Sequence, residues 1–162
     1  MGDAVQPDAL SHVDARGRAQ MVDVGGKPAT HRRAVAEGRV RVSAELATMI
    51  ASNAVAKGNL LEVARLAGIV AAKQTGALIP LCHNLPLDFV NVEARLEQSQ
   101  VCLRAEIKCE GKTGVEMEAL TAVAVAALTV IDMGKAVDRA MVIEEIRLVE
   151  KSGGRRGGPT PH

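Results

Sequence analysis

A run of 13 uncharged residues, from Ala119 to Ile131, limits how this chain can fold more than any other feature of its sequence. The run is apolar apart from two threonines, and it is too short to span a lipid bilayer. Thr113 and Glu116 precede it with the T-x-x-E spacing of a helix capping box, and Gly134 follows it as an expected left-handed cap. A helix that is apolar on every side must be covered on every side. We therefore expect a buried helix that a neighbouring subunit helps to cover.

The segments on either side of this helix predict further strands and helices. Alternating apolar and polar residues indicate strands, and apolar residues three or four apart indicate helices. Residues 76–86 contain two prolines and predict a loop. The predicted elements are a strand at 39–42, a helix from Ser43 to about Lys57, a helix from Leu60 to about Thr75, strands at 89–96 and 101–109, the apolar helix, and a strand at 141–150 whose inward residues are Val142, Ile146 and Leu148.

This order predicts an α+β fold of the ferredoxin-like kind, in which an antiparallel four-stranded sheet has helices packed on one face. A chain of 162 residues suits one domain. We expect an N-terminal arm at residues 1–20, a single α+β domain that carries the functional site at 21–151, and a flexible Gly/Pro-rich basic tail at 152–162.

Composition and charge exclude several classes of partner. The chain has 20 basic and 19 acidic residues, so no overall field attracts nucleic acid or a membrane surface. It has one Phe and neither Tyr nor Trp, which argues against proteins that stack single-stranded bases on aromatic rings. Its three cysteines have no C-x-x-C spacing, and no signal peptide begins the sequence. We expect a cytoplasmic protein that binds neither nucleic acid nor membranes.

Asp132 and Lys135 form the first candidate site. They lie three residues apart directly after the apolar run, so on a helix they share one face and can pair. The pair is either a surface ion pair worth about 0.5 kcal/mol or an acid/base carboxylate beside a phosphate-binding cation. The position favours the second interpretation, because little else nearby is polar.

A second candidate is the loop around Cys82 and His83. His83 either acts as a general acid/base and hydrogen-bond donor or only binds backbone groups, and Cys82 is expected to be a small buried hydrophobe. Glu116 is assigned to the capping box, whereas Glu118, about 200° further round the helix, could face a site. The preceding Gly-Lys-Thr-Gly turn could hold phosphate at the helix N-terminus, but it lacks the spacing of a P-loop.

Four lysines stand at the ends of predicted elements, where loops commonly form sites. Converging cations of this kind would suit a triphosphate, although a solvated surface is the ordinary state of lysine. The four are Lys57, Lys73, Lys135 and Lys151, and the other cations, Lys27, Arg32 and Arg33 among them, are assigned to the solvated surface.

Several segments together resemble one family, the MoaC family of cyclic pyranopterin monophosphate synthases in molybdenum cofactor biosynthesis. The resemblance runs through MVDVGGK, THRRAVAEGRV, KGNLLEVARLAGIVAAKQT, LIPLCHNLPL, GKTGVEMEALTAVAVAALTVIDMGKAV and KSGGRRG. It implies a cytoplasmic hexamer, built as a trimer of dimers, with sites at subunit interfaces. The implied reaction converts 3',8-cyclo-7,8-dihydroguanosine 5'-triphosphate, which is derived from GTP, into cyclic pyranopterin monophosphate and pyrophosphate.

The resemblance also implies roles for individual residues. Asp132 becomes the general acid/base, with Lys135 and Lys57 as catalytic partners, and no protein-bound metal or cofactor is implied, although a divalent metal with the phosphates is left open. The implied substrate-binding residues are Leu81, Cys82, His83, Met117, Glu118, Lys73 and Lys151. Asn84, Gly134 and Arg155 depart from the family pattern without removing any of these groups.

Two other functions remain as alternatives at this point. The first is a non-catalytic oligomeric module that binds nucleotides or other phosphate ligands on the same fold. The second is a nucleic-acid binder that uses the basic tail, and the balanced charge argues against it.

Overall fold

The computed structural model describes residues 13, 14 and 16–154, so most of the predicted arm and tail lies outside the described residues. The division into arm, domain and tail stays a prediction. The elements in chain order are β1 (Thr30–Arg41), α1 (Ala44–Ala51), α2 (Leu60–Lys73), α3 (Thr75–Leu78), β2 (Phe89–Glu97), β3 (Gln100–Gly111), α4 (Glu116–Gly134) and β4 (Val142–Ser152).

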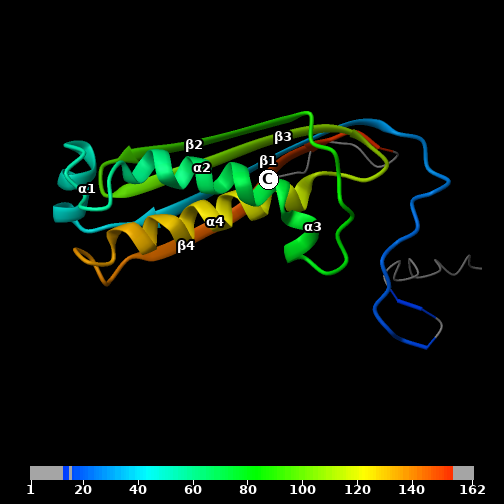
Figure 1. The fold of residues 1–162 in the computed structure, drawn as a ribbon, viewed down its shortest axis with the longest axis horizontal. Helices are drawn as coiled ribbons and strands as arrows, with labels where there is room; N and C mark the ends of the chain where they lie inside the picture. The colour runs from blue at the N-terminus through cyan, green and yellow to red at the C-terminus, as the bar shows by residue number, and fades with distance from the viewer. Residues whose placement is uncertain (1–12, 15, 155–162) are drawn as a thin grey trace, which may run out of the picture.

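The four strands form one antiparallel sheet in the order β2-β3-β1-β4. Helices α2 and α4 lie side by side across one face of this sheet, and α1 lies at one end of it (Figure 1). This arrangement confirms the predicted ferredoxin-like α+β fold. The two helix starts that the sequence marks with Ser43 and Asn59 are also confirmed, because each side chain accepts a hydrogen bond from a backbone N–H of the first turn.

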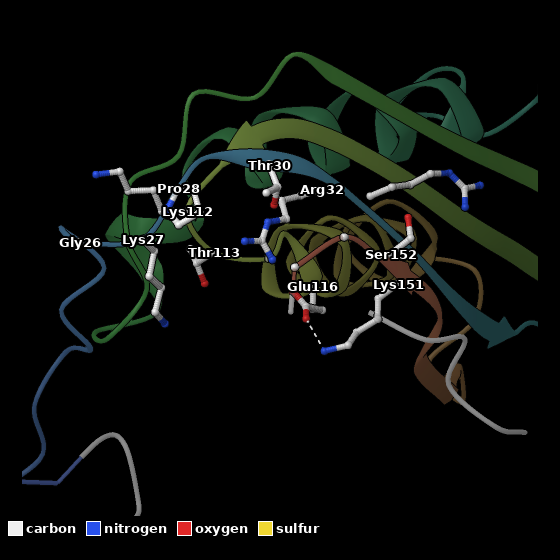
Figure 2. A pocket seen from close by; sticks show the side chains of 14 residues that line it. Gly26, Lys27, Pro28, Thr30, Arg32, Lys112, Thr113, Glu116, Lys151 and Ser152 are labelled. Atoms are coloured by element: carbon white, nitrogen blue, oxygen red, sulfur yellow. Dashed lines mark hydrogen bonds and ion pairs between the residues drawn. The ribbon is translucent and has the colours of Figure 1, made fainter. Parts of the chain in front are cut away.

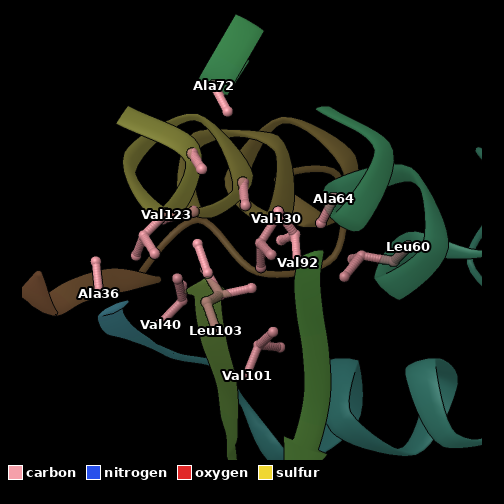
Figure 3. Close-up of a cluster of buried hydrophobic side chains, with 14 of the residues drawn as sticks. Ala36, Val40, Leu60, Ala64, Ala72, Val92, Val101, Leu103, Val123 and Val130 are labelled. Atoms are coloured by element: carbon pink, nitrogen blue, oxygen red, sulfur yellow. The ribbon is translucent and has the colours of Figure 1, made fainter. Parts of the chain in front are cut away.

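The core between the helices and the sheet is built from small aliphatic side chains. Val123 and Val130 of α4 pack toward Val92 and Leu103 of the sheet, and all four are at most 2% exposed (Figure 3). Close approach of the helices depends on Gly68, where an added Cβ would lie 3.0 Å from the main-chain oxygen of Ala122. The small-residue face of α2 therefore packs against a helix of the same chain.

The domain itself buries more than half of α4, and the expectation that a neighbouring subunit helps to cover the rest stays a prediction. Ten of its residues are buried, and Met117 and Leu128 are its exposed large apolar residues. The helix is long and apolar enough to cross a membrane, but more than half of it is buried inside the domain, as in a core helix. The exposed apolar stripe lies instead on α2, at Val63, Leu66 and Val70.

Strand β1 begins nine residues earlier than predicted, at Thr30. The segment Ala34-Val35-Ala36 is fully buried, and all three residues are 0% exposed. A central strand that is covered on both faces loses the alternation that marks a half-buried strand. The register of β1 against β3 is unbroken, whereas its pairing with β4 shifts between Val35 and Ala36 and between Arg39 and Val40, where β4 carries an extra residue.

The same irregularities change which residues of β4 face the helices. The adjacent residues Arg39 and Val40 of β1 pair with Glu145 and Ile143 of β4. Glu144 therefore has no partner on β1 and is the extra residue of a bulge. The prediction that Val142 faces inward is wrong: Ile143 packs against the core, and Val142 is 41% exposed.

Three local predictions near the helix ends are also wrong. Helix α1 ends at Ala51 rather than near Lys57. Helix α4 has no side-chain cap: its N-cap is Val115, and the carboxylate of Glu116 binds a lysine instead of closing a capping box. Gly134 is the last residue of α4 rather than a left-handed cap, and an added Cβ there would lie 2.6 Å from Cδ2 of Leu46. Its lack of a side chain serves close packing of α4 against α1.

Candidate active site

The first group of predicted site residues lies together at the C-terminal end of α4. Nζ of Lys57 lies 2.8 Å from Oδ2 of Asp132, and Nζ of Lys135 lies 2.7 Å from Oδ1 of the same carboxylate. All three side chains are about half exposed or more. The three residues assigned to catalysis thus form one exposed cluster, which we call the Asp132 cluster.

A tight turn places Lys57 in this cluster. The N–H of Gly58 donates to the carbonyl of Val55 at 2.9 Å, and Gly58 has a φ of +99°, which glycine adopts without strain. Val55 is buried and anchors the turn in the core. Nζ of Lys57 also donates to the main-chain oxygen of Asp132 at 2.9 Å, which satisfies one of the last carbonyls of α4.

The two lysines determine the protonation of the aspartate. Hydrogen bonds from Lys135, and then from Lys57, lower the pKa of Asp132 from 3.8 to about 2. At neutral pH the carboxylate is therefore ionised and holds two ammonium groups in place. In this arrangement it is a weak base, and removal of either lysine would make it a stronger one.

A cavity of about 700 Å³ lies at the opposite end of α4, and Lys151 is the predicted site residue among those the structure places on its lining. Glu116 and Lys151 form an ion pair of 2.9 Å on one side of the cavity, and Lys27 and Lys112 lie on the other (Figure 2). Burial is the largest single influence on Glu116 and opposes its ionisation, but the hydrogen bond from Lys151, a backbone hydrogen bond and the charges of Lys151 and Arg32 together lower the pKa of this carboxyl. The cations that line the cavity are Lys27, Arg32, Arg33, Lys112 and Lys151, against the single carboxylate of Glu116.

Arg32 lines the cavity, although sequence reasoning assigned it to the solvated surface. Its Nε donates to the main-chain oxygen of Gly111 at 3.2 Å, and its guanidinium lies so close to Gly154 that an added Cβ there would clash with it. Gly154 has a φ of +84°, a second reason for glycine at this position. The sequence pattern predicts the start of this strand at Arg39. A strand that begins at Thr30 puts Arg32 close to the turn at 111–114, so Arg32 was missed because the start of the strand was predicted too late.

The loop that carries Leu81, Cys82 and His83 lies near the same end of α4 but does not line the cavity. His83 contacts the main-chain oxygen of Val22 through Nε2 at 2.8 Å, which makes Nε2 the donor. Burial raises the pKa of the Cys82 thiol, and the charge of Glu118 raises it further. The expectation that Cys82 is a small buried hydrophobe is wrong in one respect, because the side chain is half-buried rather than buried.

Three further predicted residues stand close to the start of α4 or the end of α2. Glu118 is 4% exposed, and burial, with the charge of Glu116 as a smaller cause, raises the pKa of its carboxyl. Met117 is 38% exposed. Lys73 is exposed at the end of α2, beside the start of α3. None of the three lines the cavity.

One chain does not bring the Asp132 cluster and the cavity together. Glu116, which lines the cavity, and Asp132 are 16 positions apart on α4, or about 24 Å at about 1.5 Å per residue. The cations around the cavity and the Asp132 cluster are therefore separated by most of the length of α4, the helix labelled in Figure 1.

Comparison with known proteins identifies the family of this chain. A model of the MoaC family matches residues 21–154. The chain belongs to the MoaC family. A cyclic pyranopterin monophosphate synthase of Thermomicrobium roseum is 58% identical over 91% of this chain and 90% of its own length. The protein of the same name from Novosphingobium aromaticivorans is 55% identical over 91% of this chain and 94% of its own.

A third relative is a longer protein. Molybdenum cofactor biosynthesis protein 1 of Drosophila melanogaster is 59% identical over 91% of this chain, and the match covers 26% of that protein. The family domain therefore also occurs as part of a larger chain.

Proposed function

We propose that this protein catalyses the formation of cyclic pyranopterin monophosphate in molybdenum cofactor biosynthesis. The observation that carries the proposal is 58% identity to a protein of that name over nearly the full length of both chains. The expected family and enzyme class are confirmed by these relatives. The Asp132 cluster and the cation-lined cavity supply the chemistry that such a reaction needs.

The substrate that the family resemblance implies is 3',8-cyclo-7,8-dihydroguanosine 5'-triphosphate. Cyclising its phosphate requires a substrate hydroxyl to lose its proton to a base and its oxygen to bond to the α-phosphorus, while the bond from that phosphorus to the bridging oxygen breaks. Pyrophosphate leaves with the electron pair of that bond. Negative charge develops on the leaving group, and fixed cations stabilise it. Lys151 and Arg32 stand in the cavity for this role.

The proton transfers of the ring rearrangement are assigned to the Asp132 cluster. With its pKa at about 2, Asp132 accepts a proton only weakly while both lysines hold it. A substrate phosphate that draws Lys57 away would remove one of the two hydrogen bonds and raise the pKa of Asp132. Substrate binding thereby prepares the carboxylate as a base and leaves Lys135 as its partner.

A second subunit completes this site in our proposal. The Asp132 cluster and the cavity are about 24 Å apart along α4, which exceeds the reach of the triphosphate of one substrate molecule. A neighbouring copy can place its own Asp132 cluster beside the cavity. We propose a homo-oligomer, and a hexamer built as a trimer of dimers on the family resemblance. The exposed stripe of Val63, Leu66 and Val70 offers apolar surface for such contacts.

The remaining expectations concern the surroundings of the enzyme. We place it in the cytoplasm, in agreement with its three free cysteines, Cys82, Cys102 and Cys109. We propose no resident cofactor. Loss of activity on addition of EDTA would show that a divalent cation accompanies the substrate phosphates.

The test supplies the purified protein with the cyclised dihydroguanosine triphosphate. We expect one pyrophosphate per product, and a product that oxidises to a fluorescent pterin. Tight binding of the substrate without pyrophosphate release would support the alternative, a phosphate-ligand-binding module without catalysis. The cluster of cations around the cavity is the observation that favours that alternative.

A further inference from the structure

Residues 21–29, which we call the strap, pass beside the cavity and are held at two points. The main-chain oxygen of Val22 lies 2.8 Å from Nε2 of His83. The main-chain oxygen of Gly25 accepts a hydrogen bond of 2.7 Å from Nζ of Lys112. His83 belongs to the loop after α3 and Lys112 to the turn before α4, so two separate parts of the domain hold the strap.

A local turn shapes the strap between these two points. The N–H of Gly25 donates to Oδ1 of Asp23 at 2.7 Å, and the N–H of Lys27 donates to the carbonyl of Val24 at 3.1 Å. Asx turns of this kind reverse the chain over a few residues. The turn brings Lys27 to the edge of the cavity, and the strap residues that line the cavity are Gly26, Lys27 and Pro28 (Figure 2).

The strap contributes little to the hydrophobic core. None of its residues is buried, and Met21 is 47% exposed. Segments with few buried apolar contacts open at a small fraction of the free energy of global unfolding. The hydrogen bonds from His83 and Lys112 are therefore the main restraints on its position, and they can break while the sheet stays folded.

We propose that the strap is a cover that closes on a polyphosphate ligand in the cavity, and that Lys112 is the residue that positions it. Closure places the ammonium group of Lys27 against the ligand, while Lys112 keeps the strap at the edge of the cavity before the ligand arrives. This inference rests on the proposed function for the identity of the natural ligand. It does not depend on turnover.

Hydrogen–deuterium exchange with inorganic tripolyphosphate as the probe tests closure directly. We expect amide exchange across residues 21–29 to slow by about tenfold when the probe binds, because ordering restrains a weakly held segment. Lys27→Ala should lose most of this protection. Lys108→Ala is the matched control, because Lys108 lies on β3 over the ring of Phe89 and does not line the cavity.

A second readout uses the unusual composition of the chain. With no Trp and no Tyr in the sequence, Met21→Trp introduces a single fluorophore at an exposed position on the strap. We expect its emission to change on titration with tripolyphosphate, with the same midpoint as the change in exchange. A static strap, with unchanged emission and exchange although the probe binds, would overturn the proposal, and so would failure of tripolyphosphate to bind.

The role of Lys112 needs a measurement that separates positioning from direct binding of phosphate. Lys112→Ala should speed exchange of residues 22–26 in the ligand-free protein, and Lys112→Arg should restore it because arginine keeps a donor for the carbonyl of Gly25. In the pyrophosphate-release assay, Lys112→Ala should raise KM by about tenfold with little change in kcat. Unchanged exchange in ligand-free Lys112→Ala would show that Lys112 does not position the strap.

The two proposals fail in different ways. An inactive wild-type protein whose strap still responds to tripolyphosphate would overturn the proposed reaction and leave the strap intact. An active enzyme whose strap does not respond would overturn only the strap.

Discussion

Nζ of Lys57 contacts both the carboxylate and the main-chain oxygen of Asp132, at 2.8 and 2.9 Å, although the two residues are 75 positions apart. The ammonium group of Lys57 therefore both pairs with the carboxylate of Asp132 and binds a free carbonyl at the C-terminal end of α4. The relationship joins the turn after α1 to the end of α4. It also makes the Asp132 cluster sensitive to any ligand that competes for Lys57.

Asp132→Asn tests the centre of this cluster. We expect the rate of pyrophosphate release to fall by at least about 100-fold, the usual contribution of a general acid or base. The oligomeric mass by light scattering should stay unchanged, because asparagine has nearly the same size and shape as aspartate. Glu62→Gln is a matched control: Glu62 is also an exposed carboxylate in an ion pair, on α2 with Arg65. Full activity in Asp132→Asn would remove Asp132 from catalysis.

The depressed pKa of Asp132 predicts a specific dependence of stability on pH. Because the folded-state pKa, about 2, lies below the ordinary value of 3.8, the ion pairs stabilise the fold above about pH 4. This contribution is lost as pH falls from about 4 through 2. Acid titrations followed by circular dichroism should therefore be less steep in this window for Asp132→Asn. Lys135→Ala should move the carboxyl pKa toward 3.8 in an NMR titration, and an unmoved pKa would contradict the assigned cause.

Mixing inactive variants tests whether two subunits share a site. Asp132→Asn and Lys151→Gln disable opposite ends of α4. Co-refolded or co-expressed mixtures should regain up to about a quarter of wild-type activity. In a random mixture about half of the two-fold dimers contain one copy of each variant, and one of the two shared sites in such a dimer is intact. Each variant alone should stay inactive at the same total concentration. A mixture without activity, from variants of native mass, would place the complete site in one chain.

Gly134→Ala tests the close packing of α4 against α1. Alanine normally stabilises a helix relative to glycine by about 1 kcal/mol. Here the added Cβ would lie 2.6 Å from Leu46 and 3.1 Å from Met141. We expect overpacking to outweigh the helix preference and to lower the free energy of unfolding by about 1–2 kcal/mol. Gly26→Ala, which meets nothing within 4 Å, is the control, and equal urea midpoints for both variants would refute the close contact.

Asp138 is expected to stabilise the junction between α1 and the chain after α4. Its carboxylate accepts hydrogen bonds from the N–H of Ser43 at 2.6 Å and of Ala140 at 2.8 Å, and it is 7% exposed. Asp138→Ala leaves two backbone donors unpaired and should lower the free energy of unfolding by about 1–3 kcal/mol. Asp88→Ala removes one such bond at an exposed position and should cost less, as urea denaturation would measure.

The local sequence was sufficient to predict a structural feature wherever the interactions that form it lie within a few residues of one another. The caps at Ser43 and Asn59, the β2–β3 hairpin and the pairing of Asp132 with Lys135 all depend on contacts within one turn of chain. Helical and strand periodicity report such contacts directly. The order of the elements followed from them, and with it the fold class.

The tertiary structure decided what depends on distant partners. Glu116 could have closed a capping box, but its carboxylate instead pairs with Lys151, 35 residues away along the chain. The start of β1 and the phase of β4 depend on how the strands pair and where they bulge, which no local pattern encodes. Sequence alone therefore determined the elements, their order and the i,i+3 pair at the end of α4. Folding decided that Lys57 joins that pair and that Arg32 lines a cavity, because both depend on contacts between segments that only the packed sheet and helices bring together.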